Sequence, residues 1–292
     1  MFYLLKHLSC LLDISIVTWT WGEPSKSHVA GLANETGIRE IHYVTKKKKG
    51  IFSKVFWYKA PHGMNYFVES NMGTKVQALT LTRPFDFVQA EFLYTLQYGK
   101  YVSNIPIFLT EHNVEYVKYK RWYRPGERPL LYHLQLTYIR KLESTLRKRT
   151  QAVFCTSPHD QGVLAEINPG HRIEVVPNGV ELEAFEEMKP DVPLNRKLLF
   201  VGSMFYKPNN DGVMFFLRYI FPRVVSDWPE CRLFIVGKGA SGQVRDFMDN
   251  EKRIILTGPV LDVRPYLEEA NVVVVPLLSG SGTRIKILEA MA

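Results

Sequence analysis

The residues best suited to chemistry lie in the last segment of the chain, "SGSGTRIKILEAMA" (279–292). A loop of small residues lets backbone N–H groups approach a phosphate closely, and cations at the start of the following helix add positive charge. A glutamate deeper in the helix can accept hydrogen bonds from sugar or ribose hydroxyls. The candidate ligand-binding residues of this segment are Gly280, Ser281, Gly282, Thr283, Arg284, Lys286 and Glu289.

Two further glycine loops precede this one. Gly202 and Lys207 follow one apolar run, and "GKGASG" (237–242) follows the next. Because ligands bind at the carboxyl ends of strands in open α/β sheets, three such loops predict a phosphate-bearing ligand. The alternative is that the glycines form turns and the cations a solvated helix face. The 237–242 loop meets the G-x-G-x-x-G pattern of dinucleotide-binding oxidoreductases, but no clear acidic ribose-binding residue follows it.

These loops require strands and helices that alternate along the chain. Short apolar segments read as strands at 13–20, 41–45, 85–91, 105–111, 152–157, 172–178, 198–203, 231–237, 253–258 and 271–277. Strands this continuously apolar are covered on both faces, as in parallel sheets with crossover helices. A polar, proline-bearing stretch at 186–197 separates the two sets. The sequence predicts two Rossmann-like, doubly wound α/β domains, at 1–188 and 189–292.

Composition narrows the class of protein. The 292 residues are 46% hydrophobic and 23% charged, which is ordinary for a globular protein. No apolar run reaches the roughly 18 residues needed to cross a bilayer, and the opening "MFYLLKHLSCLLD" reads as an amphipathic helix rather than a signal peptide. Three cysteines far apart fit a reducing cytoplasm and no metal cluster.

The net charge of +8 is concentrated in two stretches, 46–59 with +6 and 115–149 with +7, so the rest of the chain is acidic on balance. Aromatic residues stand beside the lysines from Lys46 to Lys59, which is typical of a contact with an anionic membrane surface or an acceptor. A solvated loop is the alternative. Nucleic acid is not expected, because no nucleic-acid-binding motif is present.

Several motifs together resemble glycosyltransferase family 4, in the branch associated with exopolysaccharide assembly. They are "TEHNVE" (110–115), "AVFCTSPHDQGVL" (152–164), "PNGVE" (177–181), "LLFVGSMFYKPNNDGVMFFL" (198–217), "LTGPVLDVRPYLEEANVVVVPL" (256–277) and the terminal "SGSGTRIKILEAMA". The resemblance implies a GT-B fold, in which two Rossmann-like domains face each other across a cleft. It also implies transfer of a sugar with retention of anomeric configuration and no metal.

The resemblance assigns expected roles to particular residues. Catalytic roles fall to His112, Glu289 and Lys207, and donor binding to Gly202 and the terminal loop and helix. Glu289 matches the second glutamate of the family's E-x7-E motif, whereas the first falls at Ser281. Ser203 replaces the arginine of the usual Arg–Lys pair, and Lys207 lies about one place from the usual lysine, so phosphate binding leans on Arg284 and Lys286. A hydrogen-bonded loop residue is the alternative for His112.

The implied protein is a metal-independent, hexosyltransferase-like enzyme that uses a UDP- or GDP-sugar and no other cofactor. Its acceptor would be a glycan or a lipid-linked sugar, and its place the cytoplasm or the inner face of the cytoplasmic membrane. The alternative is a non-catalytic sugar-nucleotide-binding protein on the same fold. Relative to the family, a first strand and the segments after "LEAMA" are absent, so the resemblance implies a fragment shortened at both ends that is not expected to be active.

Overall fold

The computed structural model describes residues 2–46, 70–122, 129–186, 188, 195–279 and 283–292. The chain forms two compact units, Met1–Pro177 and Asn178–Ala292. Residues 178–188 thus belong with the second unit. The Arg264 guanidinium donates a hydrogen bond to the carbonyl of Ala184 (3.2 Å), which ties this segment to the second unit.

The first unit begins with a small parallel sheet. Strands β1 (Ser15–Thr20) and β2 (Glu40–Thr45) pair in parallel with Ser15 opposite Glu40. Helix α2 (Lys26–Thr36) connects them; the Ser25 side chain caps its start, and it ends at Gly37, whose φ of 69° suits glycine. Helix α1 (Phe2–Leu8) packs against α2.

A four-stranded parallel sheet forms the centre of the first unit, in the order β3-β4-β5-β6. The strands are β3 (Val88–Glu91), β4 (Ile107–Glu111), β5 (Ala152–Cys155) and β6 (Ile173–Val175). The connecting helices are α4 (Ser70–Thr82), the 3-10 helix η3 (Leu93–Tyr101), α5 (Glu115–Trp122), α6 (Pro129–Glu143), α7 (Leu146–Arg149) and α8 (Pro158–Ile167). Their apolar faces bury Leu93, Leu109, Ile139, Val153 and Leu164 completely.

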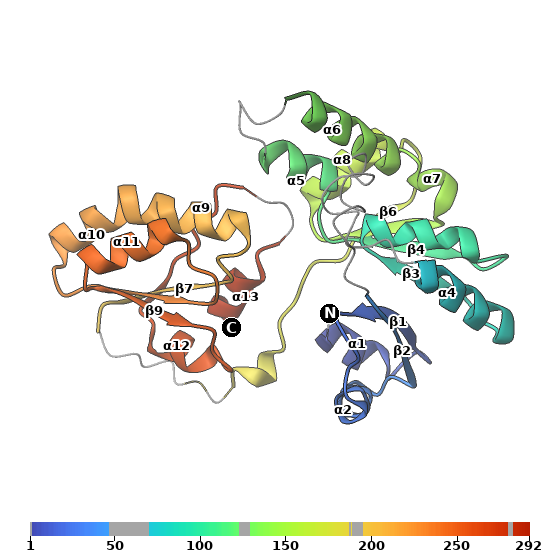
Figure 1. Ribbon diagram of the computed structural model, residues 1–292, viewed down its shortest axis with the longest axis horizontal. Helices are drawn as coiled ribbons and strands as arrows, with labels where there is room; N and C mark the ends of the chain where they lie inside the picture. The colour runs from blue at the N-terminus through green and yellow to red at the C-terminus, as the bar shows by residue number, and fades with distance from the viewer. Residues whose placement is uncertain (1, 47–69, 123–128, 187, 189–194, 280–282) are drawn as a thin grey trace. The chain divides into compact units, whose positions relative to one another are not determined.

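The second unit contains one parallel sheet in the order β10-β7-β8-β9. Its strands are β7 (Lys197–Val201), β8 (Arg232–Val236), β9 (Ile254–Gly258) and β10 (Val272–Val273). The helices are η4 (Leu182–Ala184), α9 (Lys207–Phe215), the π-helical turn η5 (Phe216–Ile220), α10 (Phe221–Asp227), α11 (Gly242–Asn250), α12 (Arg264–Glu269) and α13 (Ile285–Met291). Helices α9 to α11 cover one face of the sheet, and α12 and α13 lie on the other (Figure 1).

This strand order creates a switch point. The chain runs from β7 outward to β8 and β9, and then returns to the other side of β7 to form β10. The loops that leave the carboxyl ends of β7 and β10 therefore diverge, and in open α/β sheets ligands bind in the crevice between such loops. A ligand site is therefore expected at this switch point, where a Cβ atom on Gly202 would lie 3.0 Å from the Lys286 nitrogen.

The predicted α/β class and parallel sheets are confirmed, and each predicted strand position holds an observed strand. Most observed strands are shorter than predicted; the segment 271–277, for example, pairs only over Val272–Val273. The first unit differs from a single doubly wound sheet, because in the described residues β1 and β2 pair only with each other. None of the described helices is long and apolar enough to cross a membrane.

Candidate functional site

The ammonium of Lys286 lies at the switch point of the second unit. It donates a hydrogen bond to the Asn209 side-chain oxygen at 3.1 Å and sits 4.4 Å from the centre of the Phe200 ring. The Asn209 amide nitrogen donates in turn to the carbonyl of Ser203 at 2.9 Å. Asn209 therefore links a cation on α13 to the loop after β7.

Two glycines allow the loops at this edge to approach each other. A Cβ atom on Gly202 would lie 3.0 Å from the Lys286 nitrogen and 2.7 Å from Asn209 Nδ2. A Cβ on Gly237 would lie 2.1 Å from the carbonyl oxygen of Gly202. Both glycines have positive φ, 156° and 146°, so other residues fit poorly there. Packing within the protein thus explains Gly237, the first glycine of the 237–242 pattern, whereas a Cβ on Gly242 would meet nothing within 4 Å.

Burial makes Lys286 electrostatically unusual. Loss of solvent around the ammonium, together with the nearby Arg284, lowers the pKa of Lys286 to about 8, whereas Glu289 opposes the shift. Arg284 lies directly before α13 and Lys286 is its second residue. Two basic groups held near each other in this way favour an anion between them. A diphosphate would supply the negative charge.

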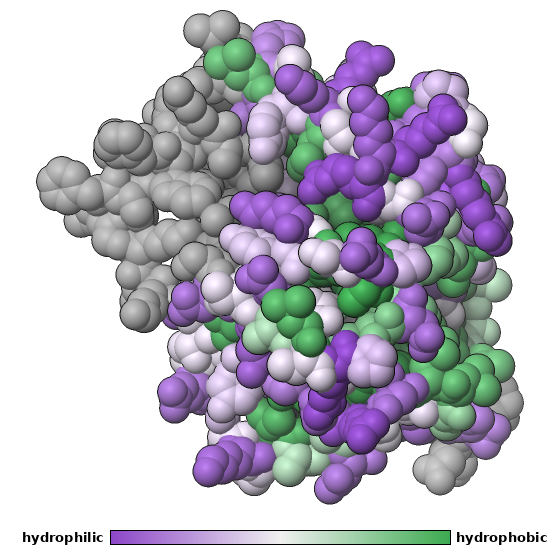
Figure 2. Space-filling model, turned by 90° about the vertical axis from the view of Figure 1, so that its right-hand side faces the viewer, coloured by the Kyte–Doolittle hydropathy of each residue, from purple (hydrophilic) through white to green (hydrophobic). Residues whose placement is uncertain are grey.

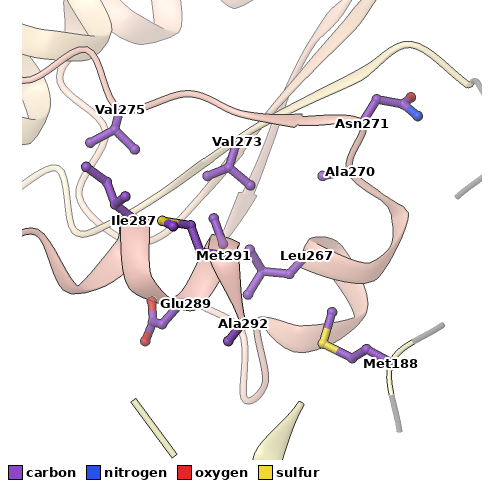
Figure 3. A pocket seen from close by; sticks show the side chains of 11 residues that line it. Met188, Leu267, Ala270, Asn271, Val273, Val275, Ile287, Glu289, Met291 and Ala292 are labelled. Atoms are coloured by element: carbon purple, nitrogen blue, oxygen red, sulfur yellow. The ribbon is translucent and has the colours of Figure 1, made fainter. Parts of the chain in front are cut away.

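Glu289 lies on the same helix and lines a pocket whose other residues are mostly of apolar types. The pocket has a volume of about 350 Å³ and is lined by α12, α13 and β10 residues together with Met188. Figure 3 shows Ile287 and Met291 directed toward Val275 and Val273, with the Glu289 carboxylate at the margin. Glu289 thus lies three residues after Lys286 on α13, at the margin of this pocket.

The other predicted donor residues have different surroundings. Lys207 begins α9, and its ammonium pairs with the Asp211 carboxylate four residues later. Gly280, Ser281 and Gly282 lie outside the described residues, and Thr283 is half-buried beside them. Of the predicted cations, Lys286 is the one that the described structure brings against the loop after β7.

His112 directly follows β4 in the first unit. Its Nε2 lies 2.7 Å from the Glu91 carboxylate, and its ring contacts Phe92 at 4.5 Å between centroids. Both Glu91 and His112 are largely but incompletely buried, with side chains 29% and 24% exposed. The alternative prediction for His112, a hydrogen-bonded loop residue, thus describes its observed contact correctly, and its catalytic role stays a prediction.

Three glutamates are buried beneath this loop. Burial and the neighbouring Glu143 and Glu115 raise the pKa of Glu111 well above its usual range. Burial raises the pKa of Glu143 to about 8, although its carboxylate accepts a hydrogen bond from the Tyr116 N–H at 3.1 Å. Glu115 accepts hydrogen bonds from Tyr94 (2.8 Å) and Lys118 (2.5 Å). Burial thus favours the protonated form of both Glu111 and Glu143.

Sequence reasoning missed Glu91 and Asn209 as parts of these sites. The signal for Glu91 is the pair of alternating patterns Gln89-x-Glu91 and Thr110-x-His112, because residues two apart share a face of a strand. Asn209 lies in the quoted "KPNND" motif, but its contact with Lys286 joins segments 77 residues apart. Local patterns do not reveal such a contact.

The predicted lysine-rich surface falls mostly outside the described residues, at 47–59. Lys46, which is described, does not fit a surface anchor: it is 7% exposed and lies about 5 Å from the rings of both Trp19 and Trp21. On the face seen in Figure 2, hydrophobic side chains form small groups among hydrophilic ones. Because Lys46 is buried, it does not take part in the predicted membrane contact.

The described part of the chain holds no group of three or more His, Cys, Asp or Glu side chains that could bind a metal ion. Independence of a metal stays a prediction.

Known structures share this fold. HepE from Anabaena in complex with UDP superposes with a TM-score of 0.60 at 12% identity, covering 96% of this chain and 78% of HepE. The α,α-trehalose 6-phosphate synthase from Burkholderia multivorans gives 0.54 at 14% identity, covering 95% and 80%. TarM gives 0.59 at 12% identity, covering 75% of this chain and 42% of TarM. These likenesses show the GT-B fold.

One curated relative is similar in sequence, an uncharacterized 44.6 kDa protein in the cps region of Klebsiella pneumoniae. It is 27% identical over 104 residues, which make up 33% of this chain and 27% of that protein. The chain thus matches about a quarter of this relative's length.

Two family models cover almost all of the chain. The model described as Glycosyl transferases group 1 matches residues 195–292, which correspond to most of the second unit. The model described as Glycosyltransferase Family 4 matches residues 14–184, more than half of the chain. The chain belongs to glycosyltransferase family 4.

Proposed function

We propose that the protein is a retaining glycosyltransferase that moves a hexose from a nucleotide sugar to a glycan or lipid-linked acceptor without a metal. The observation that carries this proposal is the half-buried Lys286 ammonium at the switch point, fixed by Asn209. Departure of a nucleoside diphosphate concentrates negative charge on the phosphates. A cation held in a partly desolvated position stabilises the charge that develops in the transition state more strongly than a cation in bulk solvent would.

The remaining assignments follow the same reaction. Arg284 and Gly202 complete the diphosphate site with the terminal loop, and Glu289 binds the ribose. His112 acts on the donor sugar. Lys207 has a smaller part, because its charge is already paired with Asp211.

Similar proteins favour a particular donor. HepE has been solved with UDP and glucose, which favours a UDP-sugar over a GDP-sugar. Trehalose-6-phosphate synthase is described as transferring a glycosyl group with retention, which favours the same stereochemistry here. The cps-region relative favours polysaccharide biosynthesis, with the protein acting in the cytoplasm or at the inner face of the cytoplasmic membrane.

Calorimetry with UDP, GDP and UDP-glucose tests donor binding by the 292-residue chain. We expect UDP to bind more tightly than GDP, and binding to persist in EDTA. Release of glucose or of a glycoside from UDP-glucose then separates a transferase from a non-catalytic nucleotide-sugar-binding protein. Turnover would exclude the non-catalytic binding protein, and no binding of either nucleotide would contradict both functions.

A further inference from the structure

Four polar side chains form one row across the carboxyl ends of β3 and β4. Glu91 is the last residue of β3 and lies opposite Thr110 of β4 in the parallel register. Gln89 lies two residues before Glu91, and His112 lies two residues after Thr110, so both pairs follow the two-residue repeat of a strand face. This arrangement places a carboxylate between two neutral polar groups and an imidazole.

One oxygen of the Glu91 carboxylate accepts hydrogen bonds from neighbouring strand residues, and the other contacts the imidazole. Its Oε1 accepts hydrogen bonds from Gln89 at 2.7 Å and from Thr110 at 3.2 Å. Gln89 also donates to the Thr110 hydroxyl at 2.9 Å. The second oxygen, Oε2, lies 2.7 Å from His112 Nε2. Since both oxygens are engaged, the carboxylate is oriented before any ligand binds.

Phe92 supports the face of the same ring. Its φ of 72° is unusual for a bulky residue, and such a backbone persists only where its surroundings fix it. Here the Phe92 N–H donates to the carbonyl of Thr110 at 3.0 Å, and its own carbonyl accepts hydrogen bonds from the N–H and hydroxyl of Thr95. The bend turns the aromatic ring onto the imidazole, with 4.5 Å between centroids.

We propose that Glu91 is a positioning residue for His112. The Glu91 carboxylate and the Phe92 ring together fix the imidazole in one rotamer, with Nε2 directed at the carboxylate. The Nδ1 atom is then the nitrogen that remains for a ligand, and the group suited to it is a hydroxyl of the donor sugar. A carboxylate on one ring nitrogen fixes the orientation of the imidazole and stabilises positive charge on it. The assignment of the donor-sugar hydroxyl to Nδ1 rests on the proposed transferase function, whereas the contacts among Glu91, Phe92 and His112 do not.

Nitrogen-15 spectra of the histidine rings test the geometry without any activity. In the unmodified 292-residue chain we expect a ring N–H signal of His112, assigned by its loss in His112→Gln, that exchanges slowly with water and comes from Nε2. The variant Glu91→Ala should lose this signal. A matched control is Glu40→Ala, because Glu40 holds Nε2 of His42 at 2.9 Å in the same unit. That variant should change only the signal of His42.

An unchanged His112 signal in Glu91→Ala, or a His112 signal from Nδ1 in the unmodified chain, would overturn the proposal. If Glu91→Ala fails to fold, Thr110→Val provides the second test. It removes one hydrogen bond to the carboxylate and should broaden the His112 signal or speed its exchange.

Kinetics test the positioning role in the reaction. With UDP-glucose as donor, Glu91→Gln should lower kcat by about 10- to 100-fold, as the loss of a partner that orients a catalytic group commonly does. The KM for UDP-glucose should change little, since the diphosphate is bound by residues of the second unit, and Glu91→Asp should recover part of kcat. A large rise in KM with kcat unchanged would overturn the positioning role. Failure of the unmodified chain to bind UDP would reject the proposed function, while the spectra would still decide the contact.

Discussion

The Lys286 ammonium and the Asn209 side-chain oxygen are 3.1 Å apart, although they come from α13 and α9. The contact crosses the switch point between β10 and β7 and fixes the direction of the lysine. Because Asn209 also binds the loop carbonyl of Ser203 at 2.9 Å, the cation and the loop are positioned together.

Replacement of Lys286 is expected to weaken nucleotide binding. A hydrogen bond to a charged group contributes about 1.5–3 kcal/mol, so Lys286→Gln should raise the Kd for UDP by about 10- to 100-fold. Lys207→Gln removes a charge already paired with Asp211 and should raise it by less than about threefold. Titration calorimetry gives both values, with the exposed Lys252→Gln as control. A larger loss in Lys207→Gln than in Lys286→Gln would assign the phosphate contact to α9.

Nucleotide binding should also be coupled to proton uptake. The pKa of Lys286 is lowered to about 8 in the free protein by burial and Arg284, and a bound diphosphate would favour the charged form. The affinity for UDP is therefore expected to fall as the pH rises through 8. Calorimetry at pH 8 in buffers with different ionisation enthalpies measures the protons taken up. In Lys286→Arg this uptake should disappear, because arginine remains charged; uptake that survives would point to another group.

Replacement of glycine by alanine is expected to change the free energy of unfolding in opposite directions at two positions within helices. In α9, a Cβ on Gly212 would lie 2.6 Å from the Pro276 carbonyl oxygen, whereas a Cβ on Gly162 in α8 meets nothing within 4 Å. Gly162→Ala should raise the free energy of unfolding by up to about 1 kcal/mol through helix propensity. Gly212→Ala should lower it by about 1–3 kcal/mol, because the helix must move away from the loop after β10. Urea unfolding followed by circular dichroism measures both, and equal effects would contradict the close approach at Gly212.

Much of the fold could be predicted from the sequence because it is written in local patterns. Continuously apolar strands such as β7 and β8 are separated by helical segments, which predicts parallel sheets covered on both faces. The end of β10 could not be predicted, since "VVVVP" continues as an apolar run although only Val272–Val273 pair with β7. The apolar run extends to Val275 in residues that do not pair, so it does not mark where pairing ends.

The candidate sites were predicted less completely. The residue types of the proposed diphosphate site are visible in the sequence, and Lys286 is among them. The pairing of Lys207 with Asp211 has the i,i+4 spacing of one helix and is a local pattern, whereas the contact that fixes Lys286 through Asn209 depends on side-chain directions across two helices. Lys46 shows the reverse case: a lysine run predicts solvent exposure, but two tryptophans near the end of β1 bury its first member. Contacts between distant segments decide these details.

Because of the buried glutamates, we expect the free energy of unfolding to fall as the pH rises. The pKa of Glu143 is about 8 in the folded protein and 4.5 without burial, so between these values the folded state binds more protons than the unfolded state. The stabilisation from this bound proton is complete below pH 4.5 and is lost as the pH rises to about 8, at about 1.4 kcal/mol per pH unit for one such group. Glu111, whose pKa is also raised, adds to the slope.

Glu143→Gln cannot lose a proton and keeps an oxygen for the Tyr116 N–H, so it should flatten the pH dependence and be more stable than the unmodified chain at pH 8. Urea unfolding at pH 5, 6.5 and 8 measures this, with Glu166→Gln, an exposed position on α8, as the control that should leave the slope unchanged. A slope in Glu143→Gln as steep as in the unmodified chain would show that Glu143 is ionised in the folded protein.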